Sequence, residues 1–184
     1  MKCVRCPLGQ GREDNNYEIV WHDGSPSAKI MIVGEAPGKE EAETGKPFVG
    51  RAGKKLRSIL KDFVDLKKDV FITNTVLCRP PDNRNPEISE QDACFPHLEA
   101  MFFTIKPRLV MTVGRVSSDW LLRVIHKEYN IYEMKEVTWG GHWFLWLPLY
   151  HPSYLLRKPT AVGPFVACLQ RYKGILDKLR TNDN

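Results

Sequence analysis

The sequence predicts an α/β fold in which a parallel sheet of four strands is covered by helices on both faces. Four short apolar runs alternate with segments that have helical spacing, which is the pattern of such a sheet. In addition, 42% of the 184 residues are hydrophobic, as in a typical globular protein. A chain of this length forms one sizeable core but is short for two. We therefore expect a single domain that spans residues 1–184.

The four strands are predicted from runs that are rich in β-branched and large apolar residues. Each run ends in glycine, asparagine or a polar turn, as strands that are buried on both faces commonly do. The predicted strands are Lys29–Glu35, Asp69–Asn74, Arg108–Gly114 and His142–Pro152.

Helices are predicted where apolar residues recur every three or four positions. We expect helices over Arg51–Val64, from an N-cap at Ser89 to Phe103, over Val116–His126 and over Val166–Leu179. Three other segments lack this spacing. Residues 1–28 are predicted to form a loop-rich N-terminal lobe, residues 39–49 a polar loop, and Arg79–Glu87 an irregular segment, because it contains three prolines.

Charge and hydropathy set limits on the class of protein. The formal net charge is +5, a mild basic excess that is compatible with a polyanionic partner. The longest apolar run, Trp143–Tyr150, contains Pro148 and is too short for a transmembrane helix. The N-terminus has no apolar core of a signal peptide. We expect a soluble cytoplasmic protein with no membrane partner.

Four of the five cysteines have a spacing that is typical of a metal centre. Cys3 and Cys6 form a CxxC pair, and Cys78 and Cys94 follow far along the chain. Four such thiolates can surround zinc or an iron–sulfur cluster, and the spacing does not separate the two. The alternative is a CxxC redox pair with two unrelated core thiols. Cys168 lies in an apolar stretch and is predicted to be a core residue.

Polar side chains follow the predicted strands at the ends where ligands bind in parallel sheets. Glu35 and Glu41 follow the first strand, Asn74 ends the second and His151 follows the fourth. Taken singly, each has an ordinary structural explanation, such as a turn, a helix cap or a solvated charge. Their occurrence together at one edge of the sheet predicts a functional site there.

Several motifs together resemble those of the family 4 uracil-DNA glycosylases. They are GEAPGKEE (Gly34–Glu41), GKPFVGRAG (Gly45–Gly53), ITNTVLCRPPDNRNP (Ile72–Pro86) and YHPSYLLRKP (Tyr150–Pro159), with the four cysteines. The resemblance extends over nearly the whole chain. It implies a three-layer α/β/α sandwich around a four-stranded parallel sheet. It also implies that the protein flips uracil out of DNA and hydrolyses its N-glycosidic bond, which leaves an abasic site.

The resemblance gives the cysteines and three pocket residues specific roles. Cys3, Cys6, Cys78 and Cys94 match the ligands of the family's [4Fe-4S] cluster, held in an N-terminal segment. Phe48 matches the aromatic residue that stacks on the extruded uracil. Asn74 matches the residue that recognises the uracil edge, and His151 matches the histidine that donates to uracil O2.

Three residues of the first two motifs receive less direct roles. Related glycosylases place a water-activating aspartate where this chain has Ala36, so Glu35 is our candidate for positioning the water. The backbone amides of Glu35 and Ala36 are expected to donate to uracil O2. Glu41 is expected to crowd the 5-position of the base and so to reject thymine.

The last motif is expected to contact the DNA. Leu155 is predicted to be the wedge that fills the gap left by the flipped base, with Leu156 as the second choice. Ser153 and Arg157 are expected to bind phosphates. The cluster is expected to present Arg79 and Arg84 to the DNA.

Two other functions remain open at the level of sequence. One is a non-catalytic DNA-binding or replication-accessory module that keeps the fold and the cluster. The other is a zinc-stabilised α/β hydrolase that acts on nucleotides. Phe48, Asn74 and His151 together argue against the first, and the wedge segment argues against the second. We expect a monomer whose partner is uracil-containing DNA, single- or double-stranded.

Overall fold

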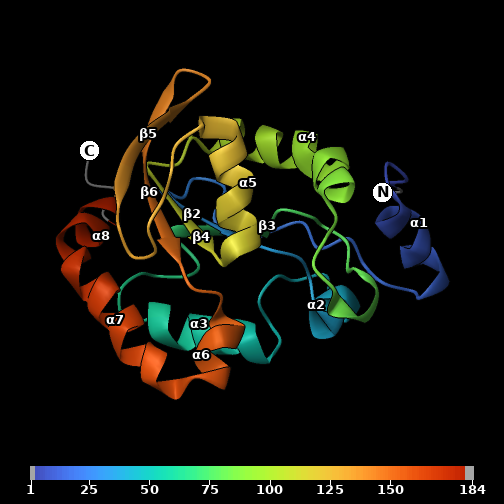
Figure 1. Cartoon of the computed structure of the whole chain (residues 1–184), viewed down its shortest axis with the longest axis horizontal. Coiled ribbons are helices and arrows are strands. Elements are labelled where there is room, and N and C mark those ends of the chain that lie inside the picture. The colour runs from blue at the N-terminus through green and yellow to red at the C-terminus, as the bar shows by residue number, and fades with distance from the viewer. Residues whose placement is uncertain (1–2, 181–184) are drawn as a thin grey trace.

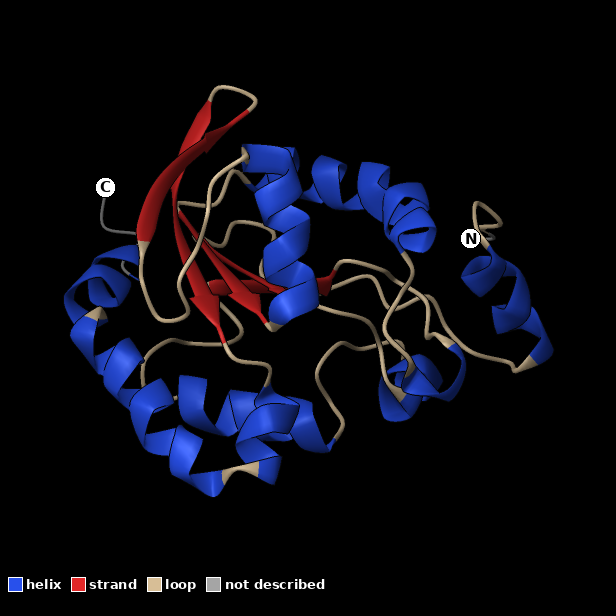
Figure 2. Cartoon of the chain, viewed as in Figure 1, coloured by secondary structure: helices blue, strands red, loops and turns tan. Residues whose placement is uncertain are grey.

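The computed structural model describes residues 3–180 and contains one mixed sheet with helices on both of its faces (Figures 1 and 2). The strands are β1 (Asp23–Gly24), β2 (Ile30–Gly34), β3 (Val70–Asn74), β4 (Leu109–Val113), β5 (Lys135–Trp139) and β6 (His142–Leu149). Their order across the sheet is β1-β3-β2-β4-β6-β5.

The four predicted strands form the centre of this sheet. β3, β2, β4 and β6 are neighbours and run parallel, which confirms the predicted parallel arrangement. The expected number of four strands is too small, because β1 and β5 pair antiparallel at the two edges. β1 has only two residues, and β5 (KEVTW) buries only Val137 fully. Neither segment has the continuous apolar run of a strand that is buried on both faces.

Eight helices surround the sheet within the described part of the chain. They are α1 (Pro7–Asp14), α2 (Lys39–Thr44), α3 (Arg51–Leu60), α4 (Ile88–Ile105), α5 (Arg115–Ile125), α6 (Pro152–Arg157), α7 (Val162–Arg171) and α8 (Lys173–Arg180). Figure 1 shows α4 and α5 on one side of the sheet and α3, α6 and α7 on the other, which gives the three layers implied by the resemblance. None of the helices described is both long and apolar enough to cross a membrane.

Each face of the sheet contributes to its own hydrophobic core. Alternate residues of a strand point to opposite faces. Ile30 and Ile32 of β2 therefore pack in the core under α3, α6, α7 and α8, whereas Met31 and Val33 pack under α4 and α5. Because helices cover both faces of these strands, side chains of the sheet can reach a ligand at the carboxyl ends of the strands.

Several predicted boundaries are wrong at positions where capping or a turn decides the structure. Residues 39–49 are not all loop, because the carboxylate of Glu41 accepts from the backbone N–H of Gly38 at the N-terminus of α2. The helix expected from Ser89 is capped instead by Glu87, whose partner in the capping box is Glu90. The helix expected over Val166–Leu179 is divided into α7 and α8 at Tyr172. The N-terminal lobe contains α1, and the proline-rich segment contains a short 3₁₀ turn at residues 81–83.

Candidate active site

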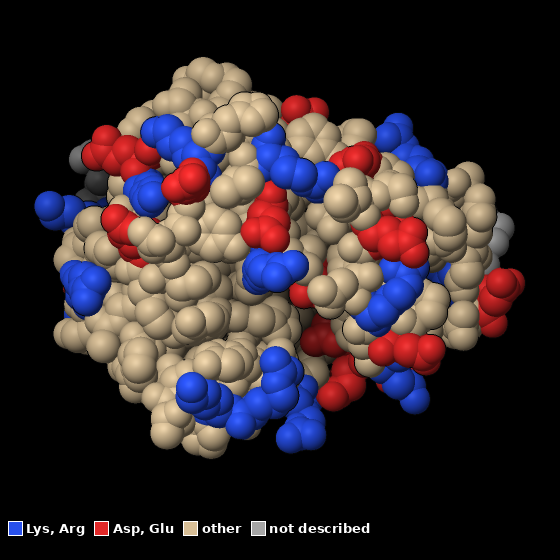
Figure 3. Space-filling model, viewed as in Figure 1, with Lys and Arg blue, Asp and Glu red and all other residues tan. Residues whose placement is uncertain are grey.

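An open pocket lies at the carboxyl ends of β2, β3 and β6. Six of the predicted site residues line it, from four separate segments of the chain. They are Glu35, Ala36, Glu41, Phe48, Asn74 and His151. The ends of parallel strands meet at one edge of a sheet, and this is why residues so distant in sequence come together. Figure 3 shows a hollow between two lobes of the surface, with acidic side chains inside it and basic side chains beside it.

Asn74 is the last residue of β3, and its side chain lies at the floor of this pocket. It is only 2% exposed, and its carboxamide makes no hydrogen bond with any group that the structure describes, so what remains exposed of it faces the pocket. The carboxamide offers one acceptor and two N–H donors to whatever enters the pocket. Asn74 is therefore suited to recognising the polar edge of a ligand.

Gly34, directly opposite Asn74 in the sheet, makes room for two pocket side chains at once. A Cβ atom at this position would lie 2.4 Å from Oδ1 of Asn74 and 2.4 Å from Cζ of Phe48. Both distances are far inside van der Waals contact. The absence of a side chain at Gly34 thus brings the carboxamide and the aromatic ring close together.

His151 is the N-cap of α6, and its ring has a defined tautomer. Nδ1 accepts a hydrogen bond from the backbone N–H of Ser153 at 3.2 Å and lies 2.7 Å from the Ser153 hydroxyl. Because Nδ1 accepts, the proton of the neutral ring is assigned to Nε2. Burial, with a smaller contribution from the charge of Arg157, lowers the pKa of His151 to about 4. The ring is therefore a neutral donor at pH 7.

The two glutamates of the pocket have different surroundings. Burial raises the pKa of Glu35, and the hydroxyl of Thr75 donates to its backbone carbonyl at 2.6 Å. The carboxylate of Glu41 accepts from the backbone N–H of Gly38 at 3.1 Å and from that of Gly50 at 2.8 Å. Glu41 therefore joins the two loops that form the pocket wall, a role that its sequence position did not indicate.

The predicted DNA-contacting residues of the last motif do not line the pocket. Leu155 is 1% exposed and packs in the core, so its assignment as the wedge is wrong. Leu156 is 38% exposed and is the leucine that can reach a partner. Ser153 turns its hydroxyl toward His151, and Arg157 donates to that hydroxyl at 3.3 Å. The side chain of Ser153 thus orients the histidine in this structure.

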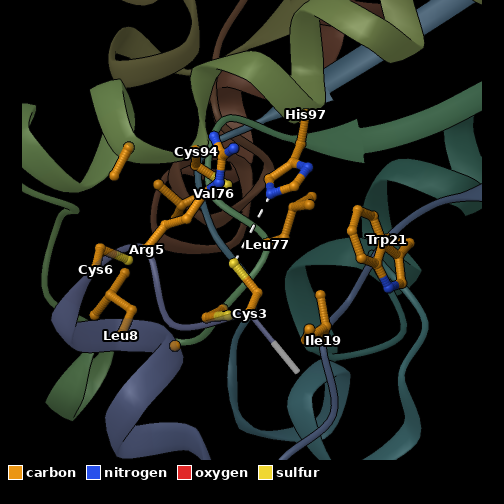
Figure 4. Close-up of a pocket in the computed structure, with 13 residues that line it drawn as sticks. Cys3, Arg5, Cys6, Leu8, Ile19, Trp21, Val76, Leu77, Cys94 and His97 are labelled. Atoms are coloured by element: carbon orange, nitrogen blue, oxygen red, sulfur yellow. Dashed lines mark hydrogen bonds between the residues drawn. The ribbon is translucent and has the colours of Figure 1, made fainter. Parts of the chain in front are cut away.

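The four cysteines line a second cavity, next to α1 (Figure 4). Nε2 of His97 lies 3.8 Å from Sγ of Cys3 there. Burial raises the pKa of Cys78 to about 11 and that of Cys94 to about 12, so a metal would have to displace their protons. No group of three His, Cys, Asp or Glu side chains among those that the structure describes is placed to hold a metal ion. Four thiols around one cavity are the donor set that zinc and iron–sulfur clusters take. Cys168 is a buried core residue, as predicted.

A family model described as the uracil DNA glycosylase superfamily matches residues 21–173. The chain belongs to this superfamily. The chain is assigned to a branch of this superfamily by its sequence identity to three type-4 uracil-DNA glycosylases. It is 41% identical to that of Saccharolobus solfataricus (86% of this chain, 74% of that protein). It is 37% identical to the type-4 enzyme of Pyrobaculum aerophilum, over 94% of this chain and 88% of that protein. It is 39% identical to that of Thermotoga maritima, over 85% of this chain and 79% of that protein. Within the uracil DNA glycosylase superfamily, the chain therefore belongs to the type-4 branch.

The pocket of this uracil DNA glycosylase family member also contains basic residues that the sequence did not single out. Lys39 and Arg51 line it, together with Arg84. Lys39 and Arg51 both lie inside the quoted motifs, so the sequence contained a signal for them. Arg84, expected to face DNA, makes two hydrogen bonds with the carboxylate of Glu90, at 2.8 and 2.6 Å. Arg79 donates to Tyr17 and Asn83. These contacts hold the 79–84 segment over the pocket edge.

Proposed function

We propose that this protein excises uracil from DNA: it flips the nucleotide out of the strand and hydrolyses the N-glycosidic bond, leaving uracil and an abasic site. The observation that supports this most directly is the unpaired carboxamide of Asn74 in a pocket shared with Phe48 and His151. The membership in the type-4 branch supports the same activity. We further propose that the protein acts as a monomer in the cytoplasm.

In this proposal, Asn74 and Phe48 select the base. Uracil presents an acceptor at O4 and a donor at N3–H, and a carboxamide held in one orientation matches both. The ring of Phe48 supplies an apolar face on which the extruded base stacks. Glu41, fixed by the amides of Gly38 and Gly50, limits the space near the 5-position and so excludes the methyl group of thymine.

His151 and the Glu35–Ala36 backbone amides act on the leaving base. Breaking the bond between C1′ and N1 leaves its electron pair on uracil, with negative charge at O2, and positive charge on the sugar. The Nε2–H donor of His151 and the two amides stabilise the charge at O2. Glu35 positions the water whose oxygen bonds to C1′, and the water's proton is released. Arg157, with Ser153 beside it, contacts a backbone phosphate of the DNA.

The proposed activity is tested with a single-stranded oligonucleotide that contains one uracil. Incubation with the protein followed by alkali should break the strand at the uracil position, because an abasic site is labile to alkali. The same oligonucleotide with thymine is the control and should stay intact. Binding of both oligonucleotides without any cleavage would contradict the proposal and would favour the alternative of a non-catalytic DNA-binding module.

The two leucines of α6 provide a prediction that separates core packing from DNA contact. Leu155→Ala should lower the free energy of unfolding by about 2–5 kcal/mol, because it leaves a cavity in the core. Leu156→Ala should change it by less than about 0.5 kcal/mol, as exposed sites do. Leu156→Ala should also lower excision from duplex DNA more than from single strands, since only a duplex leaves a gap to fill. Equal losses on both substrates would show that Leu156 is not the wedge.

We propose that Cys3, Cys6, Cys78 and Cys94 hold a [4Fe-4S] cluster. Its contribution is structural, because the proposed reaction involves no oxidation or reduction. A cluster bound by these residues connects the N-terminal segment to the 78–94 segment, one part of which forms the pocket edge. The shape of the pocket edge that contacts DNA therefore depends on the link that the cluster makes between these two segments.

Metal analysis of protein prepared without oxygen is therefore expected to find about four irons per chain and a broad visible absorption, as thiolate-bound clusters give. Cys78→Ser should lower the yield of folded protein before it affects chemistry, because binding energy of the metal is folding energy. The matched control is Cys168→Ser. Cys168 lies outside the cysteine cavity, so this variant should keep the iron content of the unmodified protein. Stoichiometric zinc without iron would contradict the assignment.

A further inference from the structure

Phe48 has a backbone conformation that few residues with a side chain adopt. Its φ of 56° lies in the left-handed region. Such a conformation persists only where the surrounding structure holds it, and it is common at functional sites. One support comes from α3. A Cβ atom on Gly53 would lie between 2.1 and 2.3 Å from the backbone of Phe48, so only glycine lets this backbone rest on the helix.

The second support is the guanidinium of Arg57, one turn beyond Gly53 on the same face of α3. Its Nε donates to the carbonyl oxygen of Phe48 at 3.0 Å, and its Nη2 donates to that of Pro47 at 2.9 Å. The same Nη2 pairs with the carboxylate of Asp23 in the edge strand β1. One side chain thus fixes two successive carbonyl groups and is itself held by the sheet.

The direction of the Phe48 ring depends on this backbone. The ring packs against Gly34, where its Cζ and Oδ1 of Asn74 approach the same point. A rotation of the 47–48 backbone would move the ring away from the carboxamide. Arg57 does not line the pocket, so any effect of it on a ligand must pass through Phe48.

We propose that Arg57, oriented by Asp23, is the positioning residue for Phe48 and sets the plane of the ring on which the base stacks. This inference rests on the proposed function. The fork of the guanidinium is needed because it donates to two carbonyls while it pairs with a carboxylate. A lysine at this position keeps the charge but is a point donor without that fixed geometry.

The test compares Arg57→Lys with Asp23→Asn and with a matched control, Arg123→Lys. Arg123 also uses its guanidinium to contact two acceptors, in Asp92 and Gln91, but lies outside the pocket. Arg57→Lys should lower the single-turnover rate on single-stranded uracil DNA by about 10- to 100-fold, as misplacement of a binding group does. It should weaken inhibition by free uracil in parallel, while affinity for the thymine oligonucleotide stays unchanged. Asp23→Asn should give a smaller loss of the same kind, and Arg123→Lys none.

A double-mutant cycle separates positioning from general stability. If Arg57 acts through the ring, Arg57→Lys should cause no further loss of rate in a Phe48→Ala protein. Additive losses, or an unchanged rate for Arg57→Lys alone, would overturn the proposal. If Arg57→Lys fails to fold, the cycle of Asp23→Asn with Phe48→Ala replaces it. Additive losses in that cycle would overturn the proposal in the same way. If the unmodified protein excises no uracil, the proposed function fails. Binding of free uracil then decides this inference, since equal affinity in Arg57→Lys and unmodified protein would overturn it.

Discussion

Asn74→Asp is expected to remove most uracil excision at pH 8, where the new carboxylate is ionised. The substitution keeps the shape of the side chain but replaces its NH₂ group with a carboxylate oxygen. Two acceptors, this oxygen and O4 of uracil, then face each other. Leaving a buried group unpaired costs about 1–3 kcal/mol, and the mismatch involves both O4 and the carboxylate. Two such penalties give a loss of about 10²- to 10⁴-fold in the single-turnover rate.

Two further observations test the reason for that loss. A carboxyl group buried at the position of Asn74, which is 2% exposed, should have a raised pKa, so excision should recover in part as the pH falls and the donor returns. Weak excision of cytosine should also appear, because the carboxylate accepts from its N4 amino group. Asn130→Asp, at an exposed position outside the pocket, is the control and should be fully active. Full activity of Asn74→Asp on single-stranded substrate would assign base recognition to another residue.

His151→Ala is expected to lower the single-turnover rate by about 10²- to 10³-fold, the usual effect of removing a donor to a developing oxyanion. Binding of uncleaved DNA should change little, since the donor matters most once O2 becomes negative. His22→Ala removes an exposed histidine that stacks on Phe71 and should leave the rate unchanged. An unaltered rate in the His151→Ala protein would show that His151 serves only as the N-cap of α6.

The low pKa of His151 adds a stability measurement to this prediction. The folded protein protonates the ring only near pH 4, whereas the unfolded chain does so near the ordinary value of 6.5. Between these values the unfolded state binds more protons, so acidification lowers the free energy of unfolding. His151→Ala should remove this part of the pH dependence. The midpoint of thermal unfolding of the variant should therefore fall less than that of the unmodified protein between pH 7 and pH 5.

The sequence predicted the centre of the sheet and the meeting of its polar strand ends because both have local signals. Strands buried on both faces require continuous apolar runs, and such runs end where side chains become polar. Asn74 and His151 stand at two of these strand ends. The edge strands were missed since β1 is two residues long and β5 is mostly exposed or half-buried. A strand of two residues and one of five residues with a single fully buried position have too little apolar pattern to be told from a loop.

The roles of neighbouring residues in α6 could not be derived from sequence for a different reason. Leu155 and Leu156 are chemically identical, and only the rotation of a six-residue helix against the core decides which is buried. The hydrogen bond of Glu41 with the amide of Gly50 depends in the same way on how two loops approach each other. Tertiary packing determines both features, and the pattern of a single chain does not contain it. The contacts of Ser153 with His151 and of Gly38 with Glu41, in contrast, are local helix-cap contacts.

Gly34 has a consequence for how the pocket can evolve. Any missense change in its codon introduces a Cβ atom 2.4 Å from both Asn74 and Phe48, and the two side chains cannot both stay in place. Such an allele has to move the carboxamide or the ring, or both, so it should weaken uracil excision. Position 34 is therefore expected to tolerate few substitutions, and a change of base preference should begin more readily elsewhere in the pocket wall.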